Sequence, residues 1–354
     1  MNFAMWKKAL QVIPSVSKEE WDRLDVISKW LISTRAAVLI MTFISAALAG
    51  LFALRDGAFA FLPWLALVFG LIMAHASNNI FNDYTDFVRG VDKDNYYRNI
   101  YGAQPIASGL MTPRQHLTYF AVTGLLALVA GLYLVSVNAS DPVVWVLLGL
   151  GAFFVLFYTW PLKYIALGEV AVLLVWGPLM IGGGYYVLAH TWDWNVVLAC
   201  LPYALGVTTV IFGKHIDKLD KDKAKNIHTL PVVLGEKISR YTVLAMMIIP
   251  YFLTAYLIVI KFFTPVMAIV LLAVPTFLRM YPVFLKPKPE TKPEGPEGRG
   301  WPLYFVGFGF YNNRAFGMYF MLGLLLDIIL RILPATQNFL RYIPLDGQKP
   351  APPS

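Results

Sequence analysis

The chain of 354 residues is 58% hydrophobic and only 14% charged, whereas soluble domains carry about 25% charged residues. Together with a mean hydropathy of +0.60, this composition excludes an ordinary soluble domain and indicates an integral membrane protein. The formal net charge is +8, but the basic residues are concentrated in a few loops. We therefore interpret them as signals of membrane topology and expect no nucleic-acid partner.

Long apolar segments follow one another along most of the chain. A helix needs about 20 apolar residues to cross a bilayer core of about 30 Å, and by this rule we expect nine membrane-spanning helices. Residues 1–29 form a cytoplasmic or interfacial segment, with an amphipathic helix expected around residues 19–30. The expected spans are residues 31–54, 60–82, 116–137, 143–160, 165–189, 195–213, 241–260, 264–285 and 302–333.

The loops between the spans alternate in their content of Lys and Arg. The basic loops are residues 83–115, 161–164, 213–240 and 286–301, whereas each intervening loop carries one basic residue or none. The positive-inside rule then places the N-terminus and the basic loops in the cytoplasm, and the C-terminus outside, in the plasma or inner membrane. We divide the chain into a helical core (30–285), a flexible polar linker (286–301), a last span (302–334) and a tail (335–354).

A first cluster of amides and carboxylates closes the second expected span. If the helix continues, Asn78, Asn82 and Asp86 share one face, with Asn79 and Asp83 on the adjoining stripe. Gly90 then allows a turn that could bring Asp92 back to the same point. Hard oxygen donors at this density suit Mg²⁺, which is usually shared with substrate phosphates. The alternative is a polar helix cap with a solvated loop, although caps use one or two such residues.

A second acidic segment spans residues 213–235, in another basic loop. On a continuous helix Asp217 and Asp220 share a face, whereas Asp222 lies about 140° from Asp217. Three lysines form a parallel stripe suited to phosphate oxygens: Lys214, Lys218 and Lys221. The alternative is a solvated loop of mixed charge that obeys the positive-inside rule.

Both clusters are expected at the cytoplasmic mouth of the membrane, where two groups of carboxylates would repel each other unless cations bridge them. Unit charges 4 Å apart interact by about 4 kcal/mol at an effective dielectric constant of 20. A divalent metal with a diphosphate meets this requirement. A diphosphate on a long apolar chain would also explain why the site is built into membrane helices, because the chain can lie among the helices or in membrane lipid.

The first cluster reads NDYTDFVRGVD (82–92), and at these residues the sequence resembles the UbiA superfamily of intramembrane prenyltransferases. Further similarity lies in GAQPIASGLMTP (102–113), YTWPLKYIALGE (158–169) and TLPVVLG (229–235). The position of Gly90, with the last carboxylate at Asp92, resembles the branch that prenylates 1,4-dihydroxy-2-naphthoate in menaquinone biosynthesis. The resemblance implies an all-α membrane fold of about nine transmembrane helices around a central cavity.

The resemblance also implies the roles of the site residues. Two Mg²⁺ ions would bridge the diphosphate of a polyprenyl substrate, and the ionised allylic carbon would be captured by a small aromatic acceptor. The implied metal ligands are Asn82, Asp83, Asp86, Asp217 and Asp220, with Asp92 and Asp222 as further candidates. The candidates for binding the diphosphate or steering it are Arg98, Tyr158, Lys163, Lys214 and Lys218. For Tyr158, Lys163 and Arg98 the alternatives are helix packing, an interfacial anchor and a loop charge.

Three other functions remain open at this point. The acceptor could be a phenolic acid, a tetrapyrrole or a phosphosugar, with the same chemistry at the diphosphate. The protein could also be an ion-coupled transporter, although transporters place their sites near the middle of the membrane, or a non-catalytic membrane subunit. The stretch GFYNNRAFG (309–317) in the last span matches no motif that we can assign.

Overall fold

The computed structural model describes residues 1–91, 102, 104–295, 298 and 301–332. Over these residues the chain is helical, and its one β-bridge joins Ile165 to His228. Eight helices are long and apolar enough to cross a membrane: Ala36–Arg55, Phe61–Val88, Pro113–Val137, Gly168–Ala189, Trp194–Asp217, Glu236–Val259, Pro265–Leu285 and Phe305–Ile332. The remaining expected span, residues 143–160, corresponds to the shorter apolar helix Pro142–Phe157. The all-α membrane fold predicted from the sequence is therefore confirmed.

Local sequence signals set the boundaries of these helices. α7 (Pro113–Val137) begins with a capping box between Thr112 and Gln115, and Pro113 stands at its first position. α8 (Pro142–Phe157) also begins with a capping side chain followed by proline, Asp141 accepting a hydrogen bond from the Val143 N–H. With 16 residues, α8 is about 24 Å long, which explains why it falls short of the length of a full span.

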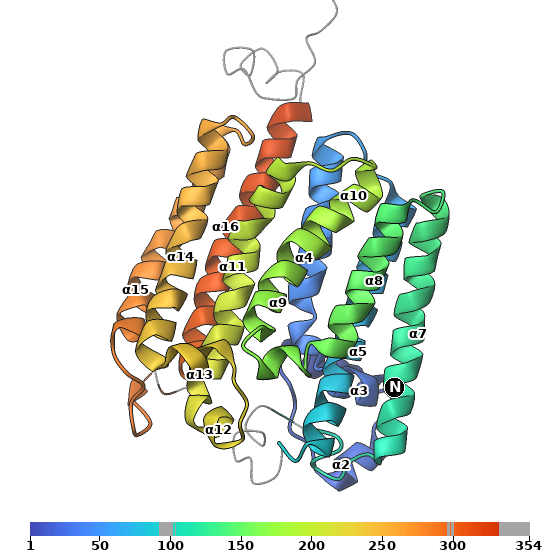
Figure 1. The fold of residues 1–354 in the computed structure, drawn as a ribbon, viewed down its shortest axis with the longest axis vertical. Helices are drawn as coiled ribbons and strands as arrows, with labels where there is room; N and C mark the ends of the chain where they lie inside the picture. Colours follow the sequence, from blue (N-terminus) through green and yellow to red (C-terminus); the bar gives the residue numbers. More distant parts are fainter. Residues whose placement is uncertain (92–101, 103, 296–297, 299–300, 333–354) are drawn as a thin grey trace, which may run out of the picture. The chain divides into compact units, whose positions relative to one another are not determined.

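The chain divides into two compact units, and the first comprises Met1–Ala47, Ala60–Ala171 and Lys223–Thr229. Its main helices are α5 (Phe61–Val88), α7 and α8, which lie side by side (Figure 1). A single turn of 3₁₀ helix, η2 (Leu162–Tyr164), follows α8. This unit contains the first acidic cluster.

The second unit comprises Leu48–Phe59, Val172–Asp222 and Leu230–Ser354. Its long helices are α11 (Trp194–Asp217), α14 (Glu236–Val259), η4 (Pro265–Ala273) continuing into α15 (Val274–Leu285), and α16 (Phe305–Ile332). α11 packs against both α14 and α16 (Figure 1). The short helices α12 (Leu219–Ala224) and α13 (Leu230–Leu234) follow α11.

The remaining elements join these helices. η1 (Ala36–Val38) leads into α4 (Ile40–Arg55), whose residues are shared by both units. The fifth span is built from α9 (Gly168–Leu174), a π-helical segment η3 (Val175–Gly182) and α10 (Gly183–Ala189). Pro178 lies inside the π-helical segment, where its missing N–H accounts for the departure from regular α-helix.

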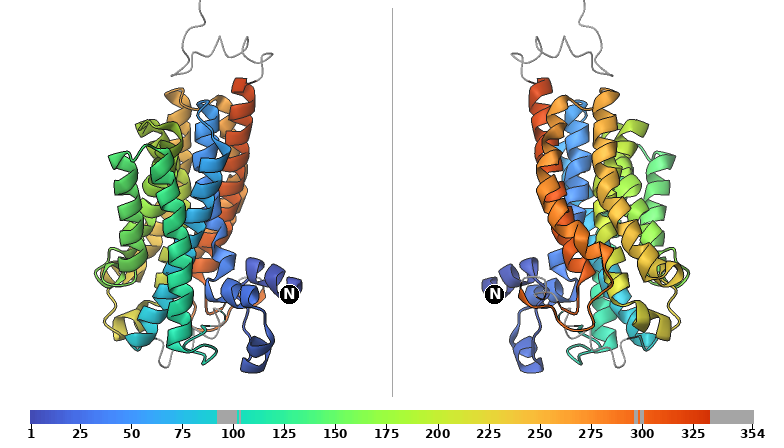
Figure 2. Two further views of the ribbon diagram at one scale, coloured as in Figure 1. Left: turned by 90° about the vertical axis from the view of Figure 1, so that its right-hand side faces the viewer. Right: turned by 90° about the vertical axis from the view of Figure 1, so that its left-hand side faces the viewer.

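The N-terminal segment differs from the prediction. In place of one helix around residues 19–30, it forms α1 (Phe3–Gln11), α2 (Lys18–Arg23) and α3 (Val26–Ser33). The break arises because Asp25 caps α3, with its carboxylate accepting from the Ser28 N–H at 3.0 Å. These helices lie at the same end of the first unit as the loop between α5 and α7 (Figure 2).

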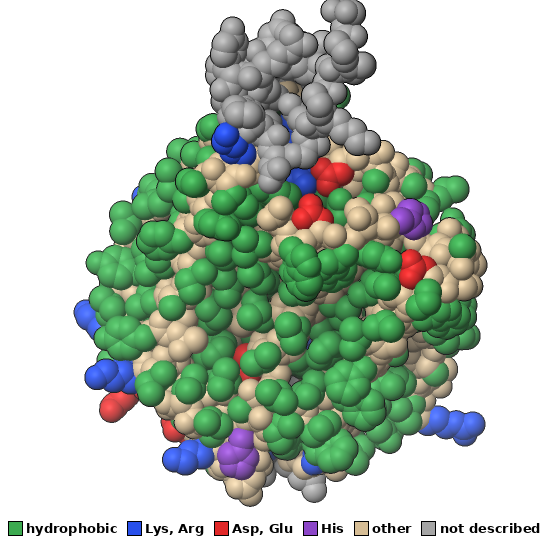
Figure 3. Space-filling model, turned by 45° about the horizontal axis from the view of Figure 1, so that its top comes forward, with side chains coloured by type: hydrophobic (Ala, Val, Ile, Leu, Met, Phe, Trp, Pro, Cys, Tyr) green, Lys and Arg blue, Asp and Glu red, His purple; other side chains and the backbone are tan. Residues whose placement is uncertain are grey.

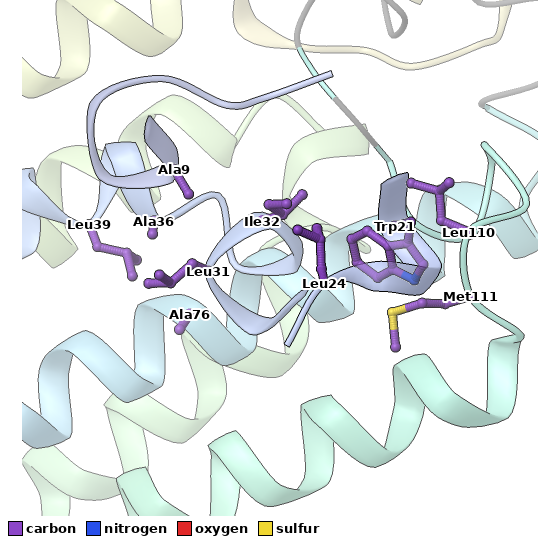
Figure 4. Packing of buried hydrophobic residues seen from close by; sticks show 10 residues of the cluster. All are labelled: Ala9, Trp21, Leu24, Leu31, Ile32, Ala36, Leu39, Ala76, Leu110 and Met111. Carbon is purple, nitrogen blue, oxygen red and sulfur yellow. The ribbon is translucent and has the colours of Figure 1, made fainter. Parts of the chain in front are cut away.

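A buried apolar cluster docks the N-terminal segment onto the first unit. Trp21 and Leu24 pack with Leu110 and Met111 of the α5–α7 loop, and Ala76 of α5 belongs to the same cluster (Figure 4). Because burial of apolar surface stabilises by about 25 cal/mol per Å², this cluster holds the end of the loop, at Leu110 and Met111, against the N-terminal segment.

The exposed surface of the protein is predominantly apolar. Side chains of the face shown in Figure 3 are mostly hydrophobic, with the charged groups scattered or near its edges. On the helices many large apolar residues are exposed, among them Phe69, Leu125 and Phe252. Exposed apolar side chains in this number would be an aggregation hazard on a water-soluble protein, so these helices are suited to contact with lipid chains.

Candidate functional site

The first acidic cluster occupies the last turns of α5. The helix continues through it to Val88, which meets the condition for a shared face, and the chain then turns at Gly90 with φ of 69°. A positive φ favours glycine, which fits a turn at this residue; the predicted return of Asp92 to the cluster falls outside the described residues. Two of the predicted site residues, Asp92 and Arg98, lie outside the described residues.

Asp86 is held by Lys163. The Lys163 ammonium donates to both carboxylate oxygens of Asp86, at 2.8 and 3.1 Å, and the two side chains are only 11% and 5% exposed. Lys163 lies in η2, and its backbone N–H donates to the Tyr158 carbonyl at 3.0 Å. The structure thus brings together three residues that the sequence predicts for one site.

Asp83, one turn earlier on α5, is held by two residues that the sequence analysis missed. Its Oδ1 accepts hydrogen bonds from the Arg35 guanidinium and from Gln104 Nε2, the latter at 3.2 Å. Arg35 lies between α3 and η1 with φ of 53°. Arg35 lies inside the expected span 31–54. An ionisable residue within a membrane span indicates a functional site, so this signal could have identified Arg35.

The three asparagines of the cluster differ in their surroundings. Asn78 Nδ2 donates to the Val155 carbonyl of α8, and Asn79 Nδ2 donates to the Thr34 carbonyl, each at 2.9 Å. These two amides therefore fasten α5 to neighbouring segments of its unit. Asn82 is half-buried one position before Asp83, where its side chain remains a candidate ligand.

The second acidic segment is not one continuous helix. α11 ends at Asp217, Lys218 is its C-cap, and α12 begins at Leu219. The premise that Asp217 and Asp220 share a helix face is therefore wrong, because the chain turns between them. Asp220 is exposed, whereas Asp217 and Asp222 are 5% and 4% exposed.

The two buried carboxylates of this segment have different partners. Asp222 pairs with Lys218 at 3.6 Å. Asp217 accepts backbone hydrogen bonds from Phe305 at 3.0 Å and from Val306 at 3.1 Å, in the first turn of α16. Lys214, also predicted for diphosphate binding, is half-buried one turn before Lys218.

Residues immediately after Asp222 belong to the first unit. Lys225 donates to the backbone carbonyls of Gly90 and Val91, directly after the end of α5. The sequence analysis interprets the basic residues of this loop as a topology signal. At least one of them, Lys225, also makes a structural contact.

The carboxylates fit a metal that is shared with a substrate. Among the described residues, no group of three or more His, Cys, Asp or Glu side chains could hold a metal ion by itself. Mg²⁺ in phosphate-transferring sites is commonly bound through one or two carboxylates together with substrate phosphates and water. Asp83 and Asp86 supply two such carboxylates on neighbouring positions of one helix face, so the donor set suits Mg²⁺ accompanied by a phosphate.

Two curated proteins align with the chain in part. The 1,4-dihydroxy-2-naphthoate octaprenyltransferase of Escherichia coli is 29% identical over 214 residues, which make up 58% of this chain and 68% of that protein. The 2-carboxy-1,4-naphthoquinone phytyltransferase of Synechocystis sp. is 30% identical over 134 residues, or 37% of this chain and 44% of that protein. The chain thus spans about two thirds of the first relative's length and less than half of the second's.

The fold has relatives among solved structures. A UbiA homolog from Archaeoglobus fulgidus, bound to GPP and Mg²⁺, superposes with a TM-score of 0.56 over 84% of this chain and 99% of that chain, at 15% sequence identity. At this level of identity the similarity shows a shared fold. The model of the UbiA prenyltransferase family matches residues 43–294, which is more than half of the chain, and the chain therefore belongs to the UbiA prenyltransferase family.

Proposed function

We propose that the protein transfers a polyprenyl group from its diphosphate to a 1,4-dihydroxy-2-naphthoate-like acceptor in the membrane, with Mg²⁺ as the cofactor. The observation that carries the proposal is the pair Asp83 and Asp86 on one turn of α5, both buried and each held by a cationic side chain. A buried carboxylate is costly unless it is paired with a cation. In the structure Arg35 and Lys163 are these cations, and Mg²⁺ would replace them at the carboxylates when the substrate binds.

Lys163 and Arg35 would stabilise the departing diphosphate in this chemistry. When bound, Mg²⁺ would be held by Asp83, Asp86 and Asn82 and would neutralise charge on the diphosphate. Lys163 and Arg35, which occupy the carboxylates in the structure, would donate to diphosphate oxygens as the allylic C–O bond breaks and the electron pair leaves with the diphosphate. Fixed donors directed at developing charge are the main source of such stabilisation.

The acceptor then supplies the new bond. An electron-rich ring carbon attacks the allylic cation, a C–C bond forms, and the proton of that ring carbon passes to the released diphosphate. Tyr158, whose carbonyl is held by Lys163, is the aromatic residue that we propose to shield this cation, since aromatic faces attract positive charge. Lys214 and Lys218 remain proposed contacts of phosphate oxygens.

Similarity to the naphthoate branch favours this acceptor over a phenolic acid, a tetrapyrrole or a phosphosugar. Two relatives that align with the chain carry naphthoate or naphthoquinone in their names. The test is to give the purified protein a labelled geranylgeranyl or longer diphosphate with each acceptor class and to identify the products by mass spectrometry. We expect a prenylated naphthoate that requires Mg²⁺; formation of another prenylated acceptor, or of none, contradicts the proposal.

The distribution of Lys and Arg also supports an orientation with the N-terminus and the acidic segments at the cytoplasmic face. Labelling of single introduced cysteines tests it, because the one native cysteine, Cys200, is fully buried. A cysteine at the exposed position Lys223 should react with an impermeant maleimide in inverted vesicles and be protected in intact cells. Labelling in intact cells would refute this orientation.

A further inference from the structure

α1 is fastened to the start of α3 by hydrogen bonds and by apolar packing. Asp25, the N-cap of α3, accepts hydrogen bonds from the Asn2 N–H at 2.8 Å and from the Trp6 indole at 3.1 Å. Ala9 lies one turn after Trp6 on the same side of α1 and is buried in the apolar cluster of the N-terminal segment. One face of α1 is therefore covered by the protein.

A neighbouring face of α1 exposes apolar side chains. Phe3 and Leu10 lie seven residues apart, which places them on one side of the helix, and they are 66% and 58% exposed. Val26 and Ile27 follow Asp25 at the start of α3 and are exposed as well. We call these four side chains the N-terminal apolar surface, which no described part of the chain covers.

Two lysines border this surface on α1. Lys7 lies between Phe3 and Leu10 on the helix, and Lys8 follows it. Both lysines are exposed, and α1 contains no acidic residue. A lysine can lay its apolar stem along such a surface while its ammonium reaches the polar side. An apolar stripe bordered by lysines is typical of helices that lie in the interface of a bilayer with anionic lipids.

A contact with α7 places this part of the chain beside a membrane span. The Trp30 indole of α3 donates to Thr123 Oγ1 at 2.9 Å, and Thr123 lies about 15 Å along α7 from Pro113. α3 therefore lies alongside α7 and not beyond its end. Figure 2 shows the N-terminal helices projecting to one side, across the direction of the long helices. The N-terminal apolar surface is thus at the height of a bilayer interface, where tryptophan is also enriched.

We propose that α1 and the start of α3 bind the surface of the bilayer, with the N-terminal apolar surface among the lipid chains and Lys7 and Lys8 at anionic headgroups. A lipid fits better than a second copy of the chain, because α3 leads directly into a membrane span and lysines at a membrane surface attract anionic lipid. The assignment does not depend on the proposed prenyl transfer. Arg35, which donates to Asp83, follows α3, so the lipid contact also anchors the segment that supplies this cation.

Quenching by brominated lipids tests this assignment on the full-length protein in vesicles. A bimane label on Leu10→Cys is exposed to mixtures of phosphatidylcholine and phosphatidylglycerol, with bromine on the acyl chains of one lipid at a time. The native Cys200 is buried and does not compete for the label. We expect quenching by both lipids, with a preference for phosphatidylglycerol. The control label is Glu19→Cys on α2, which lies below α3 in Figure 1, farther from the middle of the long helices, and it should be quenched far less.

The double variant Lys7→Gln/Lys8→Gln should lower the binding constant of phosphatidylglycerol relative to phosphatidylcholine at the Leu10 label by about 30-fold, or about 5-fold for each lysine. Lys18→Gln is the matched control, because Lys18 is exposed but pairs with Asp22, and it should leave the preference unchanged. Absence of quenching at Leu10 by either lipid, as expected if water or a second copy of the chain occupies this face, overturns the proposal. An unchanged preference in the double variant, or equal quenching at Glu19 and Leu10, overturns it as well.

Discussion

Replacing Lys163 by methionine should destabilise the protein far more than breaking an exposed ion pair. Lys163 donates two hydrogen bonds to Asp86, and the two side chains are 11% and 5% exposed. Methionine retains the apolar stem of lysine but removes the charge. Breaking a buried pair by removing one partner costs about 3–5 kcal/mol, because the other charge stays buried without compensation.

The matched control is Lys18→Met, which breaks the pair between Lys18 and Asp22. That pair has a shorter N–O distance, 2.6 Å, but its side chains are 57% and 58% exposed, and exposed pairs of this kind contribute about 0.3–0.5 kcal/mol. With about 2–4 °C per kcal/mol, we expect Lys163→Met to lower the apparent Tm by about 6–20 °C and the control to lower it by less than about 2 °C.

Tryptophan fluorescence during heating of the purified variants measures both shifts. The double variant Lys163→Met with Asp86→Asn should regain most of the lost stability, because it removes the buried charge as well. The reasoning is refuted if Lys163→Met melts within about 2 °C of the wild type, or if the double variant melts no higher than the single one.

Other variants test the surroundings of this pair. Arg35→Met, which removes the guanidinium from Asp83, should raise the KM for prenyl diphosphate about 10–150-fold, as for loss of a charge-assisted hydrogen bond; an unchanged KM in steady-state assays would count against a role in binding. Gly102→Ala places a Cβ 2.3 Å from the Ile13 side chain at a φ of 104° and should cost about 1–3 kcal/mol, seen as a lower Tm. At Asp25, desolvation raises the pKa, but hydrogen bonds from the surrounding backbone and side chains outweigh it and hold the pKa below its usual range. The stabilisation is therefore present above about pH 4 and is lost as the pH falls towards the folded-state pKa. The protection factors of the α1 amides, which correct for the intrinsic exchange rate at each pH, should therefore fall at low pH, and protection factors that stay constant would contradict this.

The spans were predictable because hydropathy and length are local properties. Each of the nine expected segments corresponds to a helix, including α5, whose last turns carry polar residues beyond the apolar run. The helix break at Asp25 also had a local signal, since an Asp before an apolar run is a typical N-cap. The amphipathic pattern of residues 19–30 predicts one helix, and the cap at Asp25 divides it.

The break after Asp217 had no such signal. The residues that follow, KLDKDKA, include no glycine or proline, so local propensity favours continuing the helix. The turn accompanies contacts of Asp217 with Phe305 and Lys288, more than 70 positions away in the chain. Long-range partners of this kind are not visible in a single sequence.

The same limit applies to the first cluster. Asp83, Asp86 and Lys163 were identified from motifs, but the pairing of Asp83 with Arg35 and Gln104 depends on how the N-terminal segment and the α5–α7 loop fold onto α5. The left-handed backbone of Arg35 is uncommon for a residue other than glycine. Residue type and spacing could therefore predict the carboxylates but only one of their partners.

The central claim is that Asp83 and Asp86 bind a prenyl diphosphate through Mg²⁺. Equilibrium binding of radiolabelled geranylgeranyl diphosphate, with Mg²⁺ or with a chelator, tests it most directly in the wild type and in Asp83→Asn/Asp86→Asn. We predict saturable binding to the wild type only with Mg²⁺, and an affinity at least about 100-fold lower in the double variant. Equal binding by both proteins, or wild-type binding that persists in the chelator, would contradict the claim.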